Sequence, residues 1–151
     1  MASLGGALKR QKRYEEALAM YRQATKASDG NPYPLLNELK LAAQLGKGVA
    51  LDAQRKFYID RAERALHAQT TDNPPYNVPW SFFDLSEIRL LKRDRDGFLD
   101  ILDKGISYCE GKWQAKTHRE SLQLYRSGGI NLPGLEEGIT KLEEAEGFLP
   151  D

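Results

Sequence analysis

The amino-acid sequence predicts an all-α fold, a right-handed solenoid of about four antiparallel helical hairpins with eight helices in total. The first observation is an apolar position that recurs about every 40 residues, at Leu18, Ile59, Leu99 and Ile139. Two further series follow it at i+3 and i+6: Tyr21, Ala62, Leu102 and Leu142, and then Ala24, Ala65, Gly105 and Ala145. A helical stripe repeated at this period is typical of stacked hairpins, in which each unit buries its apolar face against its neighbours.

Composition agrees with a single helical domain over residues 1–151. The chain is 40% hydrophobic and 29% charged, with a formal net charge of zero, so it can bury a core without disulfides, and its overall charge favours neither nucleic acid nor an anionic membrane. Cys109 is the single cysteine and fits a reducing compartment. No apolar run approaches the roughly 20 residues of a membrane span or forms a signal peptide. We therefore expect a cytoplasmic protein without a cofactor or metal.

In the first half of the chain, apolar spacing and helix breakers predict four helices, at residues 2–11, 14–27, 34–45 and 51–69. The second helix is stopped by the Asp29-Gly30-Asn31-Pro32 segment, because glycine and proline favour turns. Pro34 lies in the first turn of the third helix, where proline is tolerated. The Gly46-Lys47-Gly48 segment ends that helix, and Asp52 is a candidate N-cap for the fourth.

The second half repeats this scheme, with helices predicted at residues 79–92, 96–108, 112–125 and 134–148. The corresponding hairpin units are approximately residues 1–30, 31–72, 73–110 and 111–151. An Asn-Pro pair precedes both the third and the fifth helix and is followed by Tyr33 in one case and Tyr76 in the other. These two connections are structural corners or, alternatively, a tyrosine edge that meets a partner.

The first unit carries small and apolar residues at fixed helical positions: Leu4, Gly5 and Leu8 in its first helix, and the Tyr14-to-Ala24 segment in its second. In both helices this pattern resembles that of a tetratricopeptide repeat (TPR). The third unit is similar at Phe82, Leu85, Ser86, Leu102 and Gly105, although Phe98 stands where the family has a small residue. The resemblance implies a module that binds a protein or peptide on the concave surface formed by the first helices, without catalysis.

Under that resemblance, the partner-binding residues are the polar outward positions of the first helices. These positions are Lys9, Arg10, Asn37, Lys40, Gln44, Phe83, Asp84, Glu87, Gln114 and His118. We expect the chain to be a scaffolding segment of a longer protein. Its basic first unit and acidic last unit also allow self-association through the end repeats.

Two alternatives compete with protein binding. The first is a nucleic-acid-binding repeat that uses the basic segment from Lys9 to Arg13, against which the zero net charge argues. The second is an enzyme with Cys109 as nucleophile and His118 as base, for which no local feature indicates an activated thiol. Neither His67 nor His118 has a metal-spaced partner, so the sequence predicts no metal site.

Overall fold

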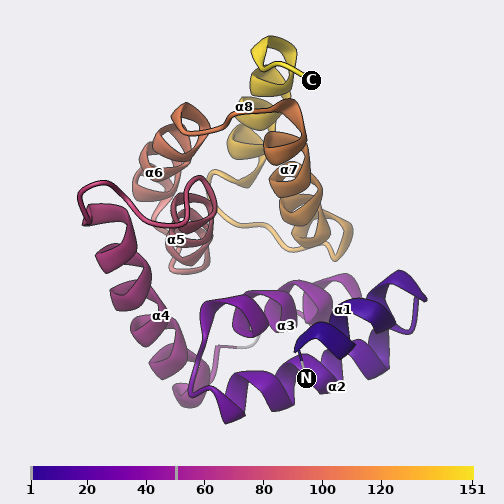
Figure 1. The fold of residues 1–151 in the computed structure, drawn as a ribbon. Coiled ribbons are helices and arrows are strands. Elements are labelled where there is room, and N and C mark those ends of the chain that lie inside the picture. Colours follow the sequence, from indigo (N-terminus) through magenta and orange to yellow (C-terminus); the bar gives the residue numbers. More distant parts are fainter. Residues whose placement is uncertain (1, 50) are drawn as a thin grey trace. The chain divides into compact units, whose positions relative to one another are not determined.

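The computed structural model describes residues 2–49 and 51–151, and these residues form helices and turns without a β-strand. The all-α prediction is confirmed, and the described residues contain the predicted eight helices (Figure 1). In chain order they are α1 (Ala2–Arg10), α2 (Tyr14–Ala27), α3 (Pro32–Gln44), α4 (Ala53–Thr71), α5 (Trp80–Leu91), α6 (Arg95–Ser107), α7 (Lys112–Ser127) and α8 (Leu135–Phe148).

Side-chain caps determine where several helices begin. Helix α3 starts at Pro32 rather than at residue 34, because Asn31 Oδ1 accepts a hydrogen bond from the Tyr33 amide at 3.0 Å. The predicted cap of α4 is confirmed, since the Arg55 amide donates to Asp52 Oδ1 at 2.8 Å. Such a bond satisfies one of the amide groups that every helix leaves unpaired at its start.

The helices gather into two compact units, which we describe separately. Unit 1 comprises Met1–Ala62 and Leu124–Ile130, and unit 2 comprises Glu63–Gln123 and Asn131–Asp151. The turn after α7 belongs to unit 1, where Gly128 lies against the Ala43 carbonyl with no room for a side chain. That the chain is one domain of four hairpin units stays a prediction.

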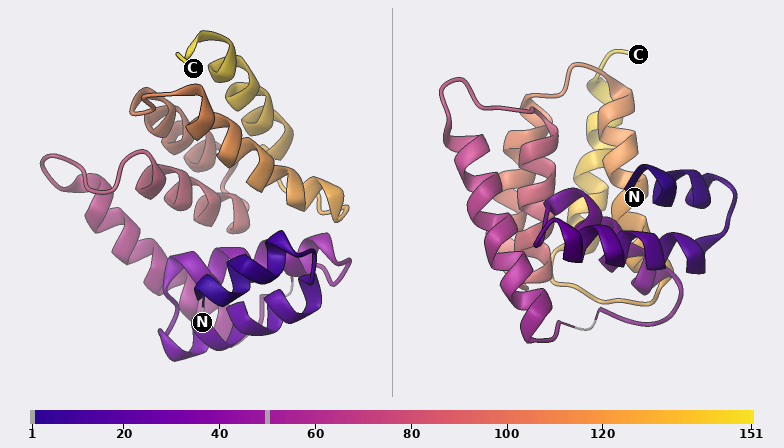
Figure 2. Two further views of the ribbon diagram at one scale, coloured as in Figure 1. Left: turned by 45° about the vertical axis from the view of Figure 1, so that its right-hand side comes forward. Right: turned by 60° about the horizontal axis from the view of Figure 1, so that its bottom comes forward.

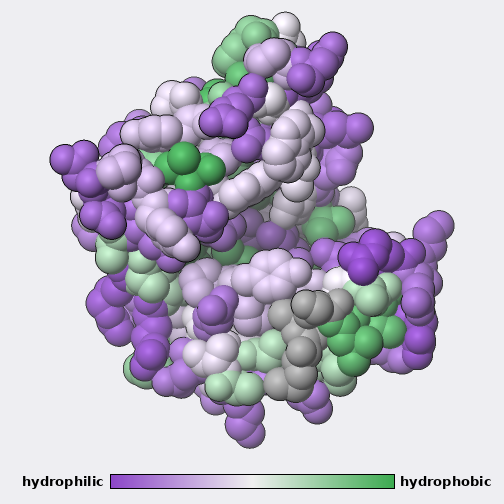
Figure 3. Space-filling view, in the orientation of Figure 1, coloured by the Kyte–Doolittle hydropathy of each residue, from purple (hydrophilic) through white to green (hydrophobic). Residues whose placement is uncertain are grey.

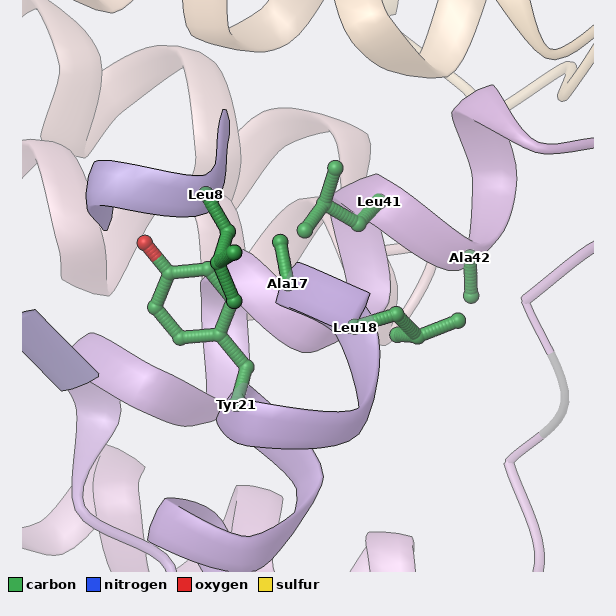
Figure 4. Packing of buried hydrophobic residues seen from close by; sticks show 6 residues of the cluster. All are labelled: Leu8, Ala17, Leu18, Tyr21, Leu41 and Ala42. Atoms are coloured by element: carbon green, nitrogen blue, oxygen red, sulfur yellow. The ribbon is translucent and has the colours of Figure 1, made fainter. Parts of the chain in front are cut away.

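Unit 1 is built around a small apolar core shared by α1, α2 and α3. Tyr21 of α2 is almost completely buried, and its ring lies beside Leu8 (Figure 4). Gly5 makes room for this ring, because a Cβ atom at that position would lie 3.0 Å from Tyr21 Cζ. The core cluster consists of Leu8, Ala17, Leu18, Tyr21, Leu41 and Ala42.

Unit 2 contains two antiparallel helix pairs. In the first pair, Gly105 near the end of α6 lies against Phe83 near the start of α5, where an added Cβ would be 2.8 Å from Phe83 Cδ1. In the second pair, Arg119 Nε of α7 binds Glu146 Oε2 of α8 at 2.6 Å. Both views in Figure 2 show α7 and α8 side by side.

Corresponding helices of the two pairs in unit 2 run parallel to each other. Trp80 and Trp113, at the starts of α5 and α7, have ring centroids 5.7 Å apart. In α6 and α8, Lys141 Nζ lies 3.0 Å from Asp103 Oδ1, and Arg95 pairs with Glu137 near the starts of both helices. Thus α5 lies along α7 and α6 along α8, each in parallel.

The recurring apolar stripe is buried at most but not all of its positions. Leu18, Ile59 and Ile139 are buried, whereas Leu99 is half-buried and Ala65 is exposed. The expectation that Ala65 faces the core is wrong, because the buried face of α4 passes through Ala62 and Leu66 instead. These two residues are four positions apart and so share one face of the helix.

On the face drawn in Figure 3, most of the surface is polar, and hydrophobic residues appear in small groups. Among the described residues, no helix combines the length and the apolar character that crossing a bilayer requires.

Candidate functional site

In unit 1, the predicted partner-binding residues differ in exposure. Arg10 is exposed, Gln44 is half-buried, and Lys9 Nζ donates to Asn37 Oδ1 at 3.1 Å. Lys40 is buried, so the expectation that it faces solvent is wrong. The physical reason is that every residue of α3 from position 38 to position 43 is buried, as in a helix that is covered on all sides rather than along one stripe.

In unit 2, four of the predicted residues are buried, and only Asp84 is half-buried. The ring of Phe83 stacks on His118 with centroids 4.4 Å apart and an interplanar angle of 4°. Gln114 Oε1 accepts a hydrogen bond from the Glu110 amide at 2.7 Å and so holds the turn before α7. The expected solvent-facing positions of Phe83, Glu87, Gln114 and His118 are therefore wrong.

The structure points instead to a group of aromatic side chains at one end of unit 2, which we call the aromatic edge. Helices α5 and α7 begin there and α6 and α8 end there, since the Lys112 amide at the start of α7 donates to the Pro150 carbonyl at 2.7 Å. Four of its side chains are exposed: Tyr108 by 40%, Trp113 by 59%, Tyr76 by 65% and Phe148 by 69%. Trp80 is half-buried and completes the edge.

A chain of ring contacts connects the aromatic edge to the core of unit 2. Trp113 contacts Trp80, and Trp80 meets Phe83 edge-on with centroids 6.0 Å apart. Tyr108 stacks on the buried ring of Phe82 with centroids 5.1 Å apart and an interplanar angle of 16°. Aromatic contacts of this kind add about 0.5–1.5 kcal/mol beyond the area that they bury. The exposed rings of Trp113 and Tyr108 are thus held by packing beneath them.

Backbone contacts also position the edge. The Cα atom of Gly111 lies beneath the Trp113 ring, because a Cβ there would be 2.9 Å from Trp113 Cδ1. Ser81 Oγ donates to the Tyr76 carbonyl at 2.7 Å and ties the loop before α5 to that helix. The edge is therefore formed by helix ends, the turn before α7 and the loop between α4 and α5.

Charged side chains of both signs flank the aromatic edge. Lys112 Nζ lies 3.0 Å from Asp151 Oδ1, and Lys116 lies 3.9 Å from Glu120 in the next turn of α7. All four side chains are well exposed, so each pair contributes little to stability. Their charges can therefore exchange partners at small cost when another chain approaches.

The sulfur of Cys109 lies close to this edge but in a different environment. Its thiol donates to the Gly105 carbonyl at 3.7 Å, and burial raises the pKa of Cys109 to about 11. A nucleophilic cysteine needs a pKa near or below neutrality, because the thiolate is the reactive form. The environment of Cys109 thus favours the unreactive thiol.

Comparison of the chain with protein-family models, with curated proteins and with solved structures found no match.

The sequence indicates Tyr76 as part of a tyrosine edge that meets a partner, but it does not predict the contact between Trp80 and Trp113. The available signal was that each tryptophan stands at the start of a first helix of its hairpin, in units that the sequence already aligned. When two hairpins stack in parallel, residues at equivalent positions become neighbours.

Proposed function

We propose that this chain is a stack of TPR-like helical hairpins that binds a partner protein or peptide, and that the aromatic edge of unit 2 is the surface that makes the contact. The observation that carries this proposal is the exposure of Trp113, 59%, in a ring that packs on Trp80. A large aromatic side chain that is both exposed and rigidly supported is the typical energetic anchor of a protein interface.

The parallel arrangement of helices in unit 2 supports the TPR-like part of the proposal. In a hairpin repeat, first helices pack on first helices and second helices on second helices. The contact of Trp80 with Trp113 and the pairing of Asp103 with Lys141 have this pattern. Gly105 provides the small residue that close packing of α5 against α6 requires.

The chemistry of the edge favours a partner segment with apolar side chains flanked by charges. Trp113 and Phe148 offer apolar area, while Lys112 and Asp151 provide one charge of each sign beside it. Apolar anchors surrounded by polar groups that exclude water are the usual composition of an interface.

Features of unit 1 argue against the nucleic-acid alternative. Within the basic segment, Arg13 Nε donates to Glu16 Oε1 at 2.9 Å, and Lys9 is engaged by Asn37. The affinity of nucleic-acid binding comes largely from Lys and Arg side chains that neutralise phosphates and so release the condensed counterions of the nucleic acid. The ion pair with Glu16 reduces the charge that Arg13 offers, whereas the bond to the neutral amide of Asn37 only orients Lys9.

The proposal is tested by affinity capture of partners on the immobilised protein, followed by titration of the captured partner against two variants. The edge variant carries Trp113→Ala and Phe148→Ala. The control variant carries Leu4→Ala and Phe57→Ala, which remove exposed hydrophobic side chains of similar exposure from unit 1. Circular dichroism shows whether each variant retains its helices.

We expect the edge variant to bind at least about tenfold more weakly than the wild type, and the control variant to bind within about twofold of it. Equal affinities for all three proteins would contradict the assignment of the edge. Equal losses in both variants would contradict it as well.

A further inference from the structure

Unit 1 contains a small pocket where α2, α3 and the start of α4 meet. Its volume is about 250 Å³, and its charged lining residues are Arg22, Glu38, Lys47, Asp52 and Arg55. Pockets for drug-sized ligands begin at roughly 300 Å³, so this one has the size for a smaller polar molecule. The pocket is far too rich in charge for an apolar ligand.

The buried wall of the pocket is the carboxylate of Glu38. This side chain is 2% exposed, and its Oε1 atom accepts a hydrogen bond from Arg55 Nη2 at 3.2 Å. Its other oxygen, Oε2, has no hydrogen-bond partner among the described residues. Burial raises the pKa of Glu38, against the opposing effect of Arg55. A buried polar atom without a partner costs about 1–3 kcal/mol and calls for an explanation.

The open side of the pocket carries two exposed cations, Arg22 and Lys47. Arg22 acts on the carboxylate of Glu38 by its charge, which lowers the pKa of Glu38, but no hydrogen bond or ion pair joins Arg22 to another described residue. Lys47 reaches only the exposed Glu15, at 3.5 Å. The pocket thus offers a hydrogen-bond acceptor at its base and cations at its mouth.

We propose that this pocket binds a small zwitterion of amino-acid size, whose ammonium group donates to Glu38 Oε2 and whose carboxylate pairs with Arg22 and Lys47. A simple anion would satisfy the cations but would be repelled by Glu38 and Asp52. A simple cation would be repelled by Arg22, Lys47 and Arg55. Only a molecule that carries both charges complements both parts of the lining, and charge complementarity of this kind determines which ligands a polar site accepts.

The test uses free L-amino acids as probes, added one at a time to the isotopically labelled full chain and followed by NMR. We expect at least one amino acid to shift the amide signals of Arg22 and Gly48 with a Kd of about 1 mM or tighter. The α-amide of that amino acid lacks the carboxylate, and its N-acetyl form lacks the ammonium group. Each of these should bind at least about tenfold more weakly, because each leaves one part of the pocket unpaired.

Variants then locate the site. Arg22→Gln should weaken binding by about tenfold, whereas Lys26→Gln, one turn further along α2 and also exposed, should leave it unchanged. Glu38→Gln removes the buried charge that the ammonium group would meet. If the Glu38→Gln protein does not fold, Lys47→Gln tests the pocket instead, because it removes a cation that the carboxylate would meet. The proposal is overturned if no amino acid binds, if the blocked derivatives bind as well as the free form, or if Arg22→Gln and Lys26→Gln behave alike. In each of these cases the pair of Glu38 and Arg55 serves only to hold α3 against α4.

Discussion

The Cβ atom that Gly138 lacks would lie 2.6 Å from Cε2 of Phe98. Phe98 is completely buried on α6. Gly138 on α8 provides the space that the ring of Phe98 occupies. Close packing of this kind leaves no room for an added methyl group.

Replacing Gly138 by alanine should therefore destabilise the protein. We expect Gly138→Ala to lower the free energy of unfolding by about 1–3 kcal/mol, because overpacking outweighs the gain in helix propensity. Urea denaturation measures this change. Gly147→Ala on the same helix is the matched control, since no atom lies within 4 Å of a Cβ there, and it should stabilise by up to about 1 kcal/mol. Equal stability of Gly138→Ala and Gly147→Ala would contradict the close contact between Gly138 and Phe98. When Phe98→Leu is added to the Gly138→Ala variant, it should restore part of the lost stability.

The contact between Phe98 and Gly138 illustrates what a single sequence can and cannot predict. Helix positions are encoded locally, and the sequence placed all eight with small errors; the cap at Asp52 is one example. The space required by Phe98 is provided by a residue from another helix. Such complementarity depends on how hairpins stack, and no local pattern reports it.

Burial on the first helices was predicted poorly for a related reason. A helical wheel assumes one buried and one exposed face, and on that assumption the sequence places Lys40 and Glu87 toward solvent. Both α3 and α5 are instead buried at most consecutive positions. In α5 the apolar character around the helix, including Phe82 and Phe83 in succession, was a signal that both faces are covered.

The ion pair between Arg119 and Glu146 should make stability depend on pH. Its hydrogen bond lowers the pKa of Glu146, against the opposing effect of partial burial. A lowered pKa in the folded state gives stability that is present above the ordinary glutamate pKa of about 4.3 and is lost as the pH falls below it. Glu146→Gln should cost about 1–2 kcal/mol at pH 7 and progressively less toward pH 3.

Urea denaturation at a series of pH values measures this dependence, with Glu120→Gln as the control. Glu120 forms an exposed pair with Lys116 at 3.9 Å, which should contribute less than about 0.5 kcal/mol. A difference between the wild type and Glu146→Gln that stays constant from pH 7 to about pH 3 would show that the carboxylate of Glu146 contributes no charge-dependent stability.

Cys109 should react slowly in the folded protein. With its pKa raised to about 11, the thiolate fraction at pH 8 is on the order of 100-fold lower than for an ordinary cysteine. Alkylation by iodoacetamide, followed by mass spectrometry, should therefore be slow at pH 8 and accelerate as the pH rises. The same chain unfolded in urea should react at the rate of a free cysteine. Rapid alkylation of the folded chain near neutral pH would instead support the enzyme hypothesis.

The two tryptophans should report separately on the surface and on the support of the aromatic edge. Trp113 is exposed and Trp80 is half-buried between Trp113 and Phe83. A Trp80→Phe variant, whose emission comes from Trp113 alone, should show emission at longer wavelength and several-fold stronger quenching by acrylamide than a Trp113→Phe variant. Each substitution keeps an aromatic ring in place, so neither should unfold the protein. Equal quenching in both variants would mean that the edge is covered, for example by a second copy of the chain, and dilution would then restore the difference because association depends on concentration.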